Sequence, residues 1–157
     1  MLLTINGRPH DVHVEPFESL ASTLRERLQM LGTKVGCDRG ECGTCTVLLD
    51  DVPVYSCLVL TRSCEGRRIR TIEGVATANE LHPVQRAFVT HDAVQCGYCT
   101  PGQVMSAIAL LEQHALPSDD EIRRSMSGNL CRCGCYPKIH AAVKSVAAAA
   151  VEANDDR

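Results

Sequence analysis

Cysteine is the residue type in this chain whose number and spacing could do chemistry. Ten of the 157 residues are cysteines, and most of them fall into short clusters. Thiolates bind soft metals, and thiols can also pair as disulfides in secreted proteins. The first residues, Met1-Leu2-Leu3-Thr4-Ile5, do not have the basic and apolar pattern of a secretory leader. We therefore expect the cysteines to be metal ligands rather than disulfide partners.

The first cysteine set has the spacing C-x4-C-x2-C-x11-C and begins in a glycine-rich segment. Plant-type [2Fe–2S] ferredoxins show the same C-x4-C-x2-C spacing followed by a distant cysteine. Gly36, Gly40 and Gly43 would allow the backbone to wrap closely around a cluster. Zinc usually takes two C-x2-C pairs, and a Rieske site would need two histidines, which this loop lacks. The predicted ligands of a first [2Fe–2S] cluster are Cys37, Cys42, Cys45 and Cys57.

The second cysteine set combines C-x2-C with C-x-C, and both pairs are predicted to lie at helix ends. Pro101 suits the first turn of a helix after the first pair, and Gly128-Asn129 suits a helix stop before the second pair. Helix N-terminal amides there would favour an anionic cluster. Zinc remains an alternative for this set, and Cys135 could replace Cys133 as a ligand. The predicted ligands of a second [2Fe–2S] cluster are Cys96, Cys99, Cys131 and Cys133.

The first half of the chain has the pattern of a small sheet with one helix. Residues 2–5 and 10–14 read as strands around an Asn6-Gly7 hairpin turn. Leucines at helical spacing predict a helix that is capped by Ser19 and stopped by Gly32. Residues 34–45 form a loop, and Cys64 is expected to be a buried or half-buried thiol without a ligand role. The further predicted strands are Thr46–Leu49, Val52–Tyr55 and Ile69–Ile72.

The second half of the chain is predicted to be helical. Its expected helices are Pro83–His91, Pro101–Ala115, one that begins at Ser118 with a capping box to Glu121, and Ile139–Ala153. The change in pattern near residue 76 divides the chain into two predicted domains, 1–76 and 77–157.

Composition excludes several functional classes. The net charge of −3 and the 3% of aromatic residues argue against a nucleic-acid interface. We expect no membrane-spanning segment, because no apolar run approaches about 18 residues. The sequence also lacks a Walker loop, a GxGxxG fingerprint and a Ser/His/Asp arrangement. We therefore expect this chain to perform no substrate chemistry itself.

Three longer motifs around the cysteines are similar to those of one known family. Gly36–Val47 resembles the distal-cluster loop of the molybdenum hydroxylases, and Gln95–Gly102 and Gly128–Cys133 resemble their proximal-cluster motifs. This is the family of xanthine dehydrogenase, aldehyde oxidoreductase and carbon monoxide dehydrogenase. The chain resembles the small iron–sulfur subunit of that family over essentially its whole length.

The resemblance implies an α+β fold and a role in electron transfer. It implies a β-grasp, plant-type ferredoxin-like domain followed by an all-α four-helix domain. The chain would be the non-catalytic iron–sulfur subunit of a molybdenum-dependent oxidoreductase. It would relay electrons from molybdopterin in a large partner subunit to FAD or haem in a flavin-binding or cytochrome partner. We expect a cytoplasmic location, with export or membrane association only through a partner.

The resemblance also implies a direction for the electrons. Gln95 and Cys133 match family positions beside the amino group of molybdopterin, so the second cluster is expected to receive electrons first. The polar first loop, with Asp38, Arg39 and Glu41, is expected to lie near the surface. The ligands of the second set are expected among apolar helices.

One departure from the family pattern bears on the substrate. The family commonly has Cys-Arg-Cys-Thr-Gly-Tyr, whereas residues 131–136 read Cys-Arg-Cys-Gly-Cys-Tyr. A glycine after the second cysteine of this motif, here Gly134, resembles the pattern of the branch that acts on aldehydes and N-heterocycles, including isoquinoline-type oxidoreductases. The substrate pocket would lie on another chain, so purines and carbon monoxide stay open as substrates. Two other functions also stay open: a free-standing ferredoxin-type shuttle, against which the helical half argues, and a zinc-binding interaction module.

Overall fold

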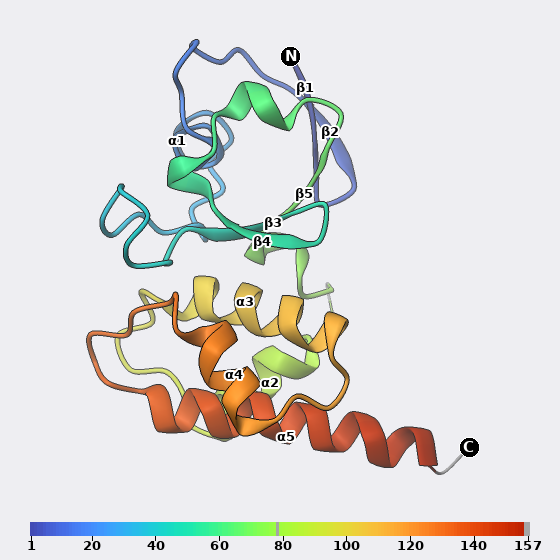
Figure 1. Cartoon of the computed structure of the whole chain (residues 1–157). Helices are drawn as coiled ribbons and strands as arrows, with labels where there is room; N and C mark the ends of the chain where they lie inside the picture. The colour runs from blue at the N-terminus through green and yellow to red at the C-terminus, as the bar shows by residue number, and fades with distance from the viewer. Residues whose placement is uncertain (78, 156–157) are drawn as a thin grey trace.

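A mixed five-stranded sheet forms one part of the molecule, and a group of helices forms the other (Figure 1). The computed structural model describes residues 1–77 and 79–155. The strand order is β2-β1-β5-β3-β4, with β1 and β5 parallel and the other pairs antiparallel. The expected α+β organisation is confirmed. The strands are β1 Leu2–Ile5, β2 Arg8–Asp11, β3 Thr46–Leu49, β4 Val52–Tyr55 and β5 Arg68–Arg70.

Two tight turns set the register of the two hairpins. Asn6 and Gly7 have φ values of 51° and 74°, and Asp50 and Asp51 have φ values of 50° and 67°. Two successive left-handed residues match the twist of the strands that they join. The predicted Asn6-Gly7 turn is therefore confirmed, but the strand predicted over residues 10–14 is shifted to β2. Similarly, β5 ends at Arg70, and the short 3-10 helix η4 (Ile72–Gly74) follows.

The helix predicted between Ser19 and Gly32 is shorter than expected. Ser19 does cap α1 (Leu20–Ser22), since its hydroxyl accepts a hydrogen bond from the Ser22 N–H. A π-helical turn, η1 (Thr23–Arg27), follows. The chain then leaves the helix because Gln29 is left-handed, with φ 56°. The prediction failed because leucine spacing continues past the point where the backbone turns away.

The second half of the chain is helical, as predicted. A capping box starts α2, formed by His82 and Gln85, and another starts α4, formed by Ser118 and Glu121. The second of these was predicted. The helices of this half are α2 Pro83–Thr90, α3 Thr100–Gln113, α4 Asp119–Met126 and α5 Tyr136–Asp155, and the sheet half also contains the 3-10 helices η2 Ser56–Leu58 and η3 Thr61–Cys64.

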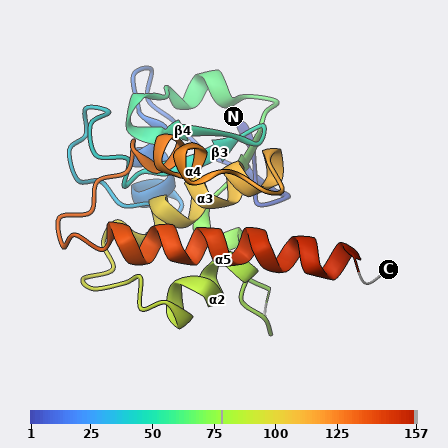
Figure 2. The same cartoon turned by 60° about the horizontal axis from the view of Figure 1, so that its bottom comes forward.

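Strand β3 joins the two halves because both of its faces are buried. Val47 and Leu49 face the core of the sheet half, whereas Leu48 faces the core of the helical half. Helix α3 lies against β3 and β4, and α2 packs on α5 at a greater distance from the sheet (Figures 1 and 2). The alternation of side chains along a strand thus lets one strand contribute to two cores.

The loops that carry the cysteines come together at one side of the molecule. Figures 1 and 2 show this for the loop before β3, the segment before α3 and the loop between α4 and α5.

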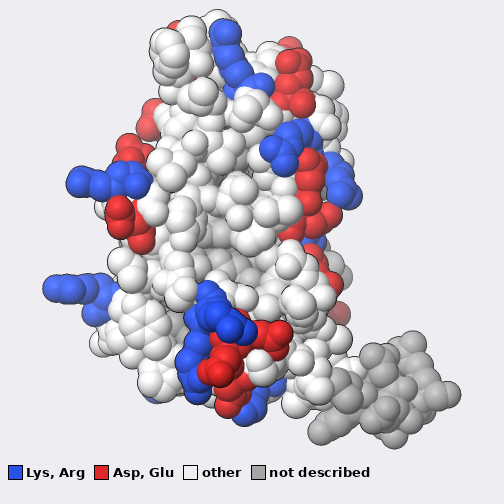
Figure 3. Space-filling view, in the orientation of Figure 1, with Lys and Arg blue, Asp and Glu red and all other residues white. Residues whose placement is uncertain are grey.

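Acidic and basic side chains lie mainly around the edges of the face in Figure 3, whose centre has few charges. Within the part of the chain that the structure describes, no helix has the length and apolar character needed to cross a bilayer.

Candidate iron–sulfur sites

The thiols of the first cysteine set lie in two contacting pairs. Cys37 and Cys42 are within hydrogen-bonding contact of each other in the loop before β3. Cys45, which directly precedes β3, makes the same kind of contact with Cys57 in η2. The structure therefore brings together all four residues that the sequence predicts for this site. Two pairs of thiols are the arrangement that two iron atoms would need.

Backbone amides of the first loop point toward one of these sulfurs. The N–H groups of Arg39 and Glu41 donate to Cys37 Sγ over 3.5 and 3.2 Å. These donors, led by Arg39, lower the pKa of Cys37 to about 7. Burial instead raises the pKa of Cys57 to about 12. The loop thus stabilises negative charge on the exposed side of the site.

Gly40 shows why this loop needs glycine. Its φ is +76°, and a Cβ built on it would lie 2.3 Å from Cδ1 of Leu58. Leu58 follows Cys57 in η2, so the loop backbone passes directly under a neighbour of the fourth predicted ligand. A side chain at position 40 would strain the backbone and push the loop away from η2.

The second cysteine set is also paired, and each pair joins two distant segments. The thiol of Cys96 contacts that of Cys133, and the thiol of Cys99 contacts that of Cys131. Cys99 is the N-cap residue of α3, whereas Cys131 and Cys133 lie in the loop between α4 and α5. The C-x2-C segment and the C-x-C segment therefore each contribute one thiol to each pair.

Thiols of the second set differ in their surroundings. Hydrogen bonding by the Tyr98 N–H, followed by the contact with Cys133, lowers the pKa of Cys96. Burial raises the pKa of Cys99 to about 12. In each pair one thiol can therefore donate a hydrogen bond to the other, Cys133 to Cys96 and Cys99 to Cys131.

Cys135 lies close to this site without being one of the paired four. Its N–H donates to Cys131 Sγ over 3.4 Å, and its thiol also contacts that of Cys131. Burial raises the pKa of Cys135. The structure therefore places Cys135 beside Cys131, whereas Cys133 lies beside Cys96.

Exposure of the site residues differs in part from the expectation. Cys131 lies in the helical core, but Cys96 and Cys133 are exposed, and so is Gln95. The expectation that all ligands of the second set lie among apolar helices is therefore wrong for two of them, because the loops carry these residues past the helix ends. Asp38, Arg39 and Glu41 in the first loop are exposed, as expected.

A cavity of about 350 Å³ lies between the two cysteine sets. Its walls include Cys37 and Cys42 on one side and Cys96, Cys99 and Cys131 on the other. Sequence reasoning did not foresee that the two sets share one cavity, since no motif in either half refers to the other.

Hydrogen bonds fasten the two cysteine regions together beside this cavity. The Leu130 N–H donates to the carbonyl oxygen of Cys42 over 2.8 Å. The Tyr98 hydroxyl donates to the carbonyl oxygen of Val35, also over 2.8 Å. Cys131 directly follows Leu130, so a single hydrogen bond connects its segment with Cys42.

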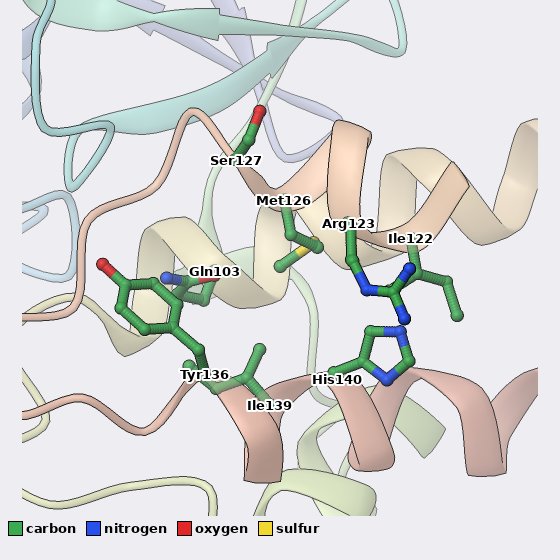
Figure 4. Close-up of a pocket in the computed structure, with 8 residues that line it drawn as sticks. All are labelled: Gln103, Ile122, Arg123, Met126, Ser127, Tyr136, Ile139 and His140. Carbon is green, nitrogen blue, oxygen red and sulfur yellow. The ribbon is translucent and has the colours of Figure 1, made fainter. Parts of the chain in front are cut away.

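A second, smaller cavity of about 130 Å³ lies among α3, α4 and α5. Gln103 and Tyr136 are at one end of it, and Arg123 and His140 are at the other (Figure 4).

Among the described residues, no set of three or more His, Cys, Asp or Glu side chains converges on a point as the ligands of one metal ion would.

Two family descriptions match the sequence. Residues 3–76 match the 2Fe-2S iron-sulfur cluster binding domain, and residues 71–144 match the [2Fe-2S] binding domain. Together these matches extend over most of the chain and include all eight paired cysteines.

Individual relatives agree with these matches. The chain is 44% identical to the aldehyde oxidoreductase iron-sulfur-binding subunit of Escherichia coli K12, over 94% of this chain and 71% of the relative. It is 45% identical to one of the nicotinate dehydrogenase subunits of Pseudomonas putida, over 92% of each. Among solved structures, a chain of quinoline 2-oxidoreductase from Pseudomonas putida 86 aligns with a TM-score of 0.91 and 45% identity, over 97% of this chain and 95% of that one.

Proposed function

Because this chain belongs to the iron–sulfur subunits of the molybdenum hydroxylase family, we propose that its two cysteine sets hold one [2Fe–2S] cluster each and relay electrons between two partner subunits. The chain is an electron-transfer subunit of an oxidoreductase complex. The proposed ligands are Cys37, Cys42, Cys45 and Cys57 for the first cluster, and Cys96, Cys99, Cys131 and Cys133 for the second.

The donor chemistry of both cysteine sets fits this proposal. When bound, a [2Fe–2S] cluster accepts and releases one electron at a time. Each set offers two pairs of contacting thiols, and each includes a thiol whose pKa is lowered by backbone N–H donors, Cys37 in the first and Cys96 in the second. Thiolates are the form that binds iron, and N–H donors to sulfur raise the reduction potential of such a cluster.

The hydrogen bond between Leu130 and Cys42 is the observation that carries the relay. It spans 2.8 Å and links the peptide before Cys131 directly to the carbonyl of a ligand in the other set. An electron that leaves the second set can therefore reach the first through covalent bonds and one hydrogen bond of this chain.

We propose that electrons enter at the second set and leave at the first. Gln95 and Cys133 are assigned to the contact with molybdopterin of a large partner subunit, and both are accessible on the surface of this chain. The exposed polar loop around Cys37 is the proposed contact with a flavin- or haem-bearing acceptor.

The substrate of the complex is proposed to be an aldehyde or an N-heterocycle. The similar proteins described above are named for aldehydes, nicotinate and quinoline.

We propose that residues 1–76 form a β-grasp ferredoxin-like unit and residues 77–157 a four-helix unit. We place the complex in the cytoplasm.

Metal and sulfide analysis of the purified chain tests the proposal. We expect about four irons and four acid-labile sulfides per chain, two of each per cluster, and two distinct EPR signals after reduction. A protein with zinc and no sulfide would replace the proposal with a zinc module. Size-exclusion of the native protein tests the role as part of a complex, because a free shuttle would elute as a small monomer rather than with larger chains.

A further inference from the structure

Three polar side chains are buried where the sheet half meets the helical half. Asn129, Gln103 and Ser106 have only 3%, 1% and 6% of their surface exposed. Buried polar groups destabilise a fold unless they find partners, so their positions need an explanation. None of the three belongs to the cysteine sets.

Asn129 is the centre of this group. Its side-chain amide nitrogen donates to the carbonyl oxygen of Gly43 over 2.9 Å and to the Thr46 hydroxyl over 3.2 Å. Its side-chain oxygen accepts from the Ser106 hydroxyl over 2.8 Å. Its backbone oxygen accepts from the Gln103 side chain, also over 2.8 Å. The polar groups of Asn129 therefore tie the α4–α5 loop to both β3 and α3.

The backbones around Asn129 touch one another directly. A Cβ on Gly43 would lie 2.3 Å from the Gly128 oxygen, and a Cβ on Gly102 would lie 2.4 Å from the Gly43 oxygen. The first cysteine loop, α3 and the α4–α5 loop thus meet without intervening side chains. Such contact leaves little freedom to shift one loop against another.

This group lies at both ends of the hydrogen bond between the cysteine sets. Gly43, which Asn129 binds, directly follows Cys42, whose carbonyl accepts that hydrogen bond. Leu130, which donates it, directly follows Asn129. The side chain of Asn129 therefore holds the residue after the acceptor, and its backbone leads directly into the donor residue.

We infer that Asn129 is a positioning residue for electron transfer between the two sites: its amide clamps Gly43 so that the Leu130 N–H stays in hydrogen-bonding distance of the Cys42 carbonyl. The inference rests on the proposed function and adds a residue to it. One electron leaves the second site and one arrives at the first, and no bond is made or broken and no proton is exchanged. Ser106 keeps the side-chain amide of Asn129 in its orientation, and Gln103 holds the backbone carbonyl of the same residue.

The test compares Asn129→Ala and the milder Ser106→Ala with the wild-type chain carrying both clusters. A flash-photoreduced flavin supplies one electron, and the rate of redistribution between the clusters is measured together with their magnetic interaction in EPR when both are reduced. Iron content and the two midpoint potentials are measured on the same samples. These readouts do not depend on substrate turnover.

We expect Asn129→Ala to slow redistribution by roughly tenfold and to change the magnetic splitting, because displacements of positioned groups by fractions of an ångström have effects of this order. Ser106→Ala should act in the same direction but less. Iron content and both potentials should stay close to those of the wild type.

Asn6→Gly is the matched control. Asn6 also joins distant segments, since it donates to the Thr71 hydroxyl and accepts from the Thr71 N–H, but it is left-handed and glycine suits that conformation. This variant should redistribute electrons at the wild-type rate.

Unchanged redistribution and splitting in Asn129→Ala would overturn the inference. Loss of iron from both Asn129→Ala and Ser106→Ala would also overturn it, because the group would then hold the clusters rather than space them. A wild-type chain without two clusters would instead refute the proposed function, so the two failures are distinguishable.

Discussion

At the scale of single residues, neighbours decide what each cysteine can do. Eight thiols lie in contacting pairs, whereas Cys64 is fully buried in the sheet core, where its thiol lies 3.8 Å from the Leu60 carbonyl oxygen. Burial raises the pKa of Cys64. Cys135 is buried too, but it contacts Cys131 through both its thiol and its N–H. The number of cysteines and their residue type alone would not distinguish these roles.

Substitution of single cysteines should separate the two sites. Cys42→Ser is expected to remove the first cluster and Cys99→Ser the second, because each loses a thiolate ligand. Cys64→Ser should retain all iron, although it will be less stable. Iron content and the two EPR signals of each variant are the measurements, and loss of iron in Cys64→Ser would contradict the assignment.

Cys135→Ala is the matched variant for the second site. It keeps the backbone N–H but removes the thiol beside Cys131, so iron content should stay the same. The second cluster should become harder to reduce, since a donor to its sulfur is lost. Loss of the second EPR signal would instead show that Cys135, rather than Cys133, is a ligand.

At the scale of elements, the shortened first helix depends on one carboxylate. Glu18 accepts hydrogen bonds from the Thr23 hydroxyl, from two nitrogens of Arg27 and from the Glu15 N–H. Arg25 within η1 donates to the carbonyl oxygen of Thr33, which lies beyond the turn, over 2.8 Å. These contacts fasten the π-helical turn to its flanking loops and so direct the chain into the first cysteine loop.

Glu18→Gln should destabilise the chain in a pH-dependent way. The hydrogen bonds from Arg27 lower the pKa of Glu18 from 4.5. Its charge therefore stabilises the fold at pH above the unfolded pKa, and this contribution is lost as pH falls through the lower folded value. We expect a loss of about 1 kcal/mol in the free energy of unfolding at pH 7, measured by urea titration.

The difference between the variant and the wild type should vanish in acid, where Glu18 is protonated in both states. Glu15→Gln is the control, because its side chain is exposed and should matter little at either pH. An equal effect of both substitutions at pH 7 would show that Glu18 has no special role.

At the scale of the whole molecule, contacts across the junction fix the relation of the two sites. Arg70 of β5 forms a double hydrogen bond with Glu112 of α3, over 3.0 and 2.5 Å. The Tyr55 hydroxyl of β4 donates to the Gly128 carbonyl oxygen over 2.8 Å. Together with the shared strand β3, these contacts hold the two cysteine sets beside one cavity.

The proposed direction of electron flow is tested in the assembled complex. Gln95→Ala should slow reduction of the clusters by substrate, because this exposed residue is assigned to the entry contact with the large subunit. Oxidation of the clusters by an artificial acceptor should stay near the wild-type rate. Rapid-mixing absorbance measurements give both rates, and the opposite pattern would show that electrons enter at the first site.

The sequence by itself determined the features that depend on near neighbours. The spacing of cysteines and glycines predicted the first four-cysteine set. This prediction was possible because three of the four cysteines lie in one short loop. The structure brings all four together. Asn6-Gly7 and the Ser118 capping box were also predicted, since turns and caps depend on a few adjacent residues. The matching families followed from the same local motifs.

Only the tertiary structure decided how distant segments meet. The pairing of Cys96 with Cys133 and of Cys99 with Cys131 depends on how α3 packs beside the α4–α5 loop. The hydrogen bond from Leu130 to Cys42, and the buried Asn129 beside it, depend on β3 lying against α3. Spacing along a chain constrains the backbone over a few residues, whereas such contacts arise from packing between elements that no local pattern encodes.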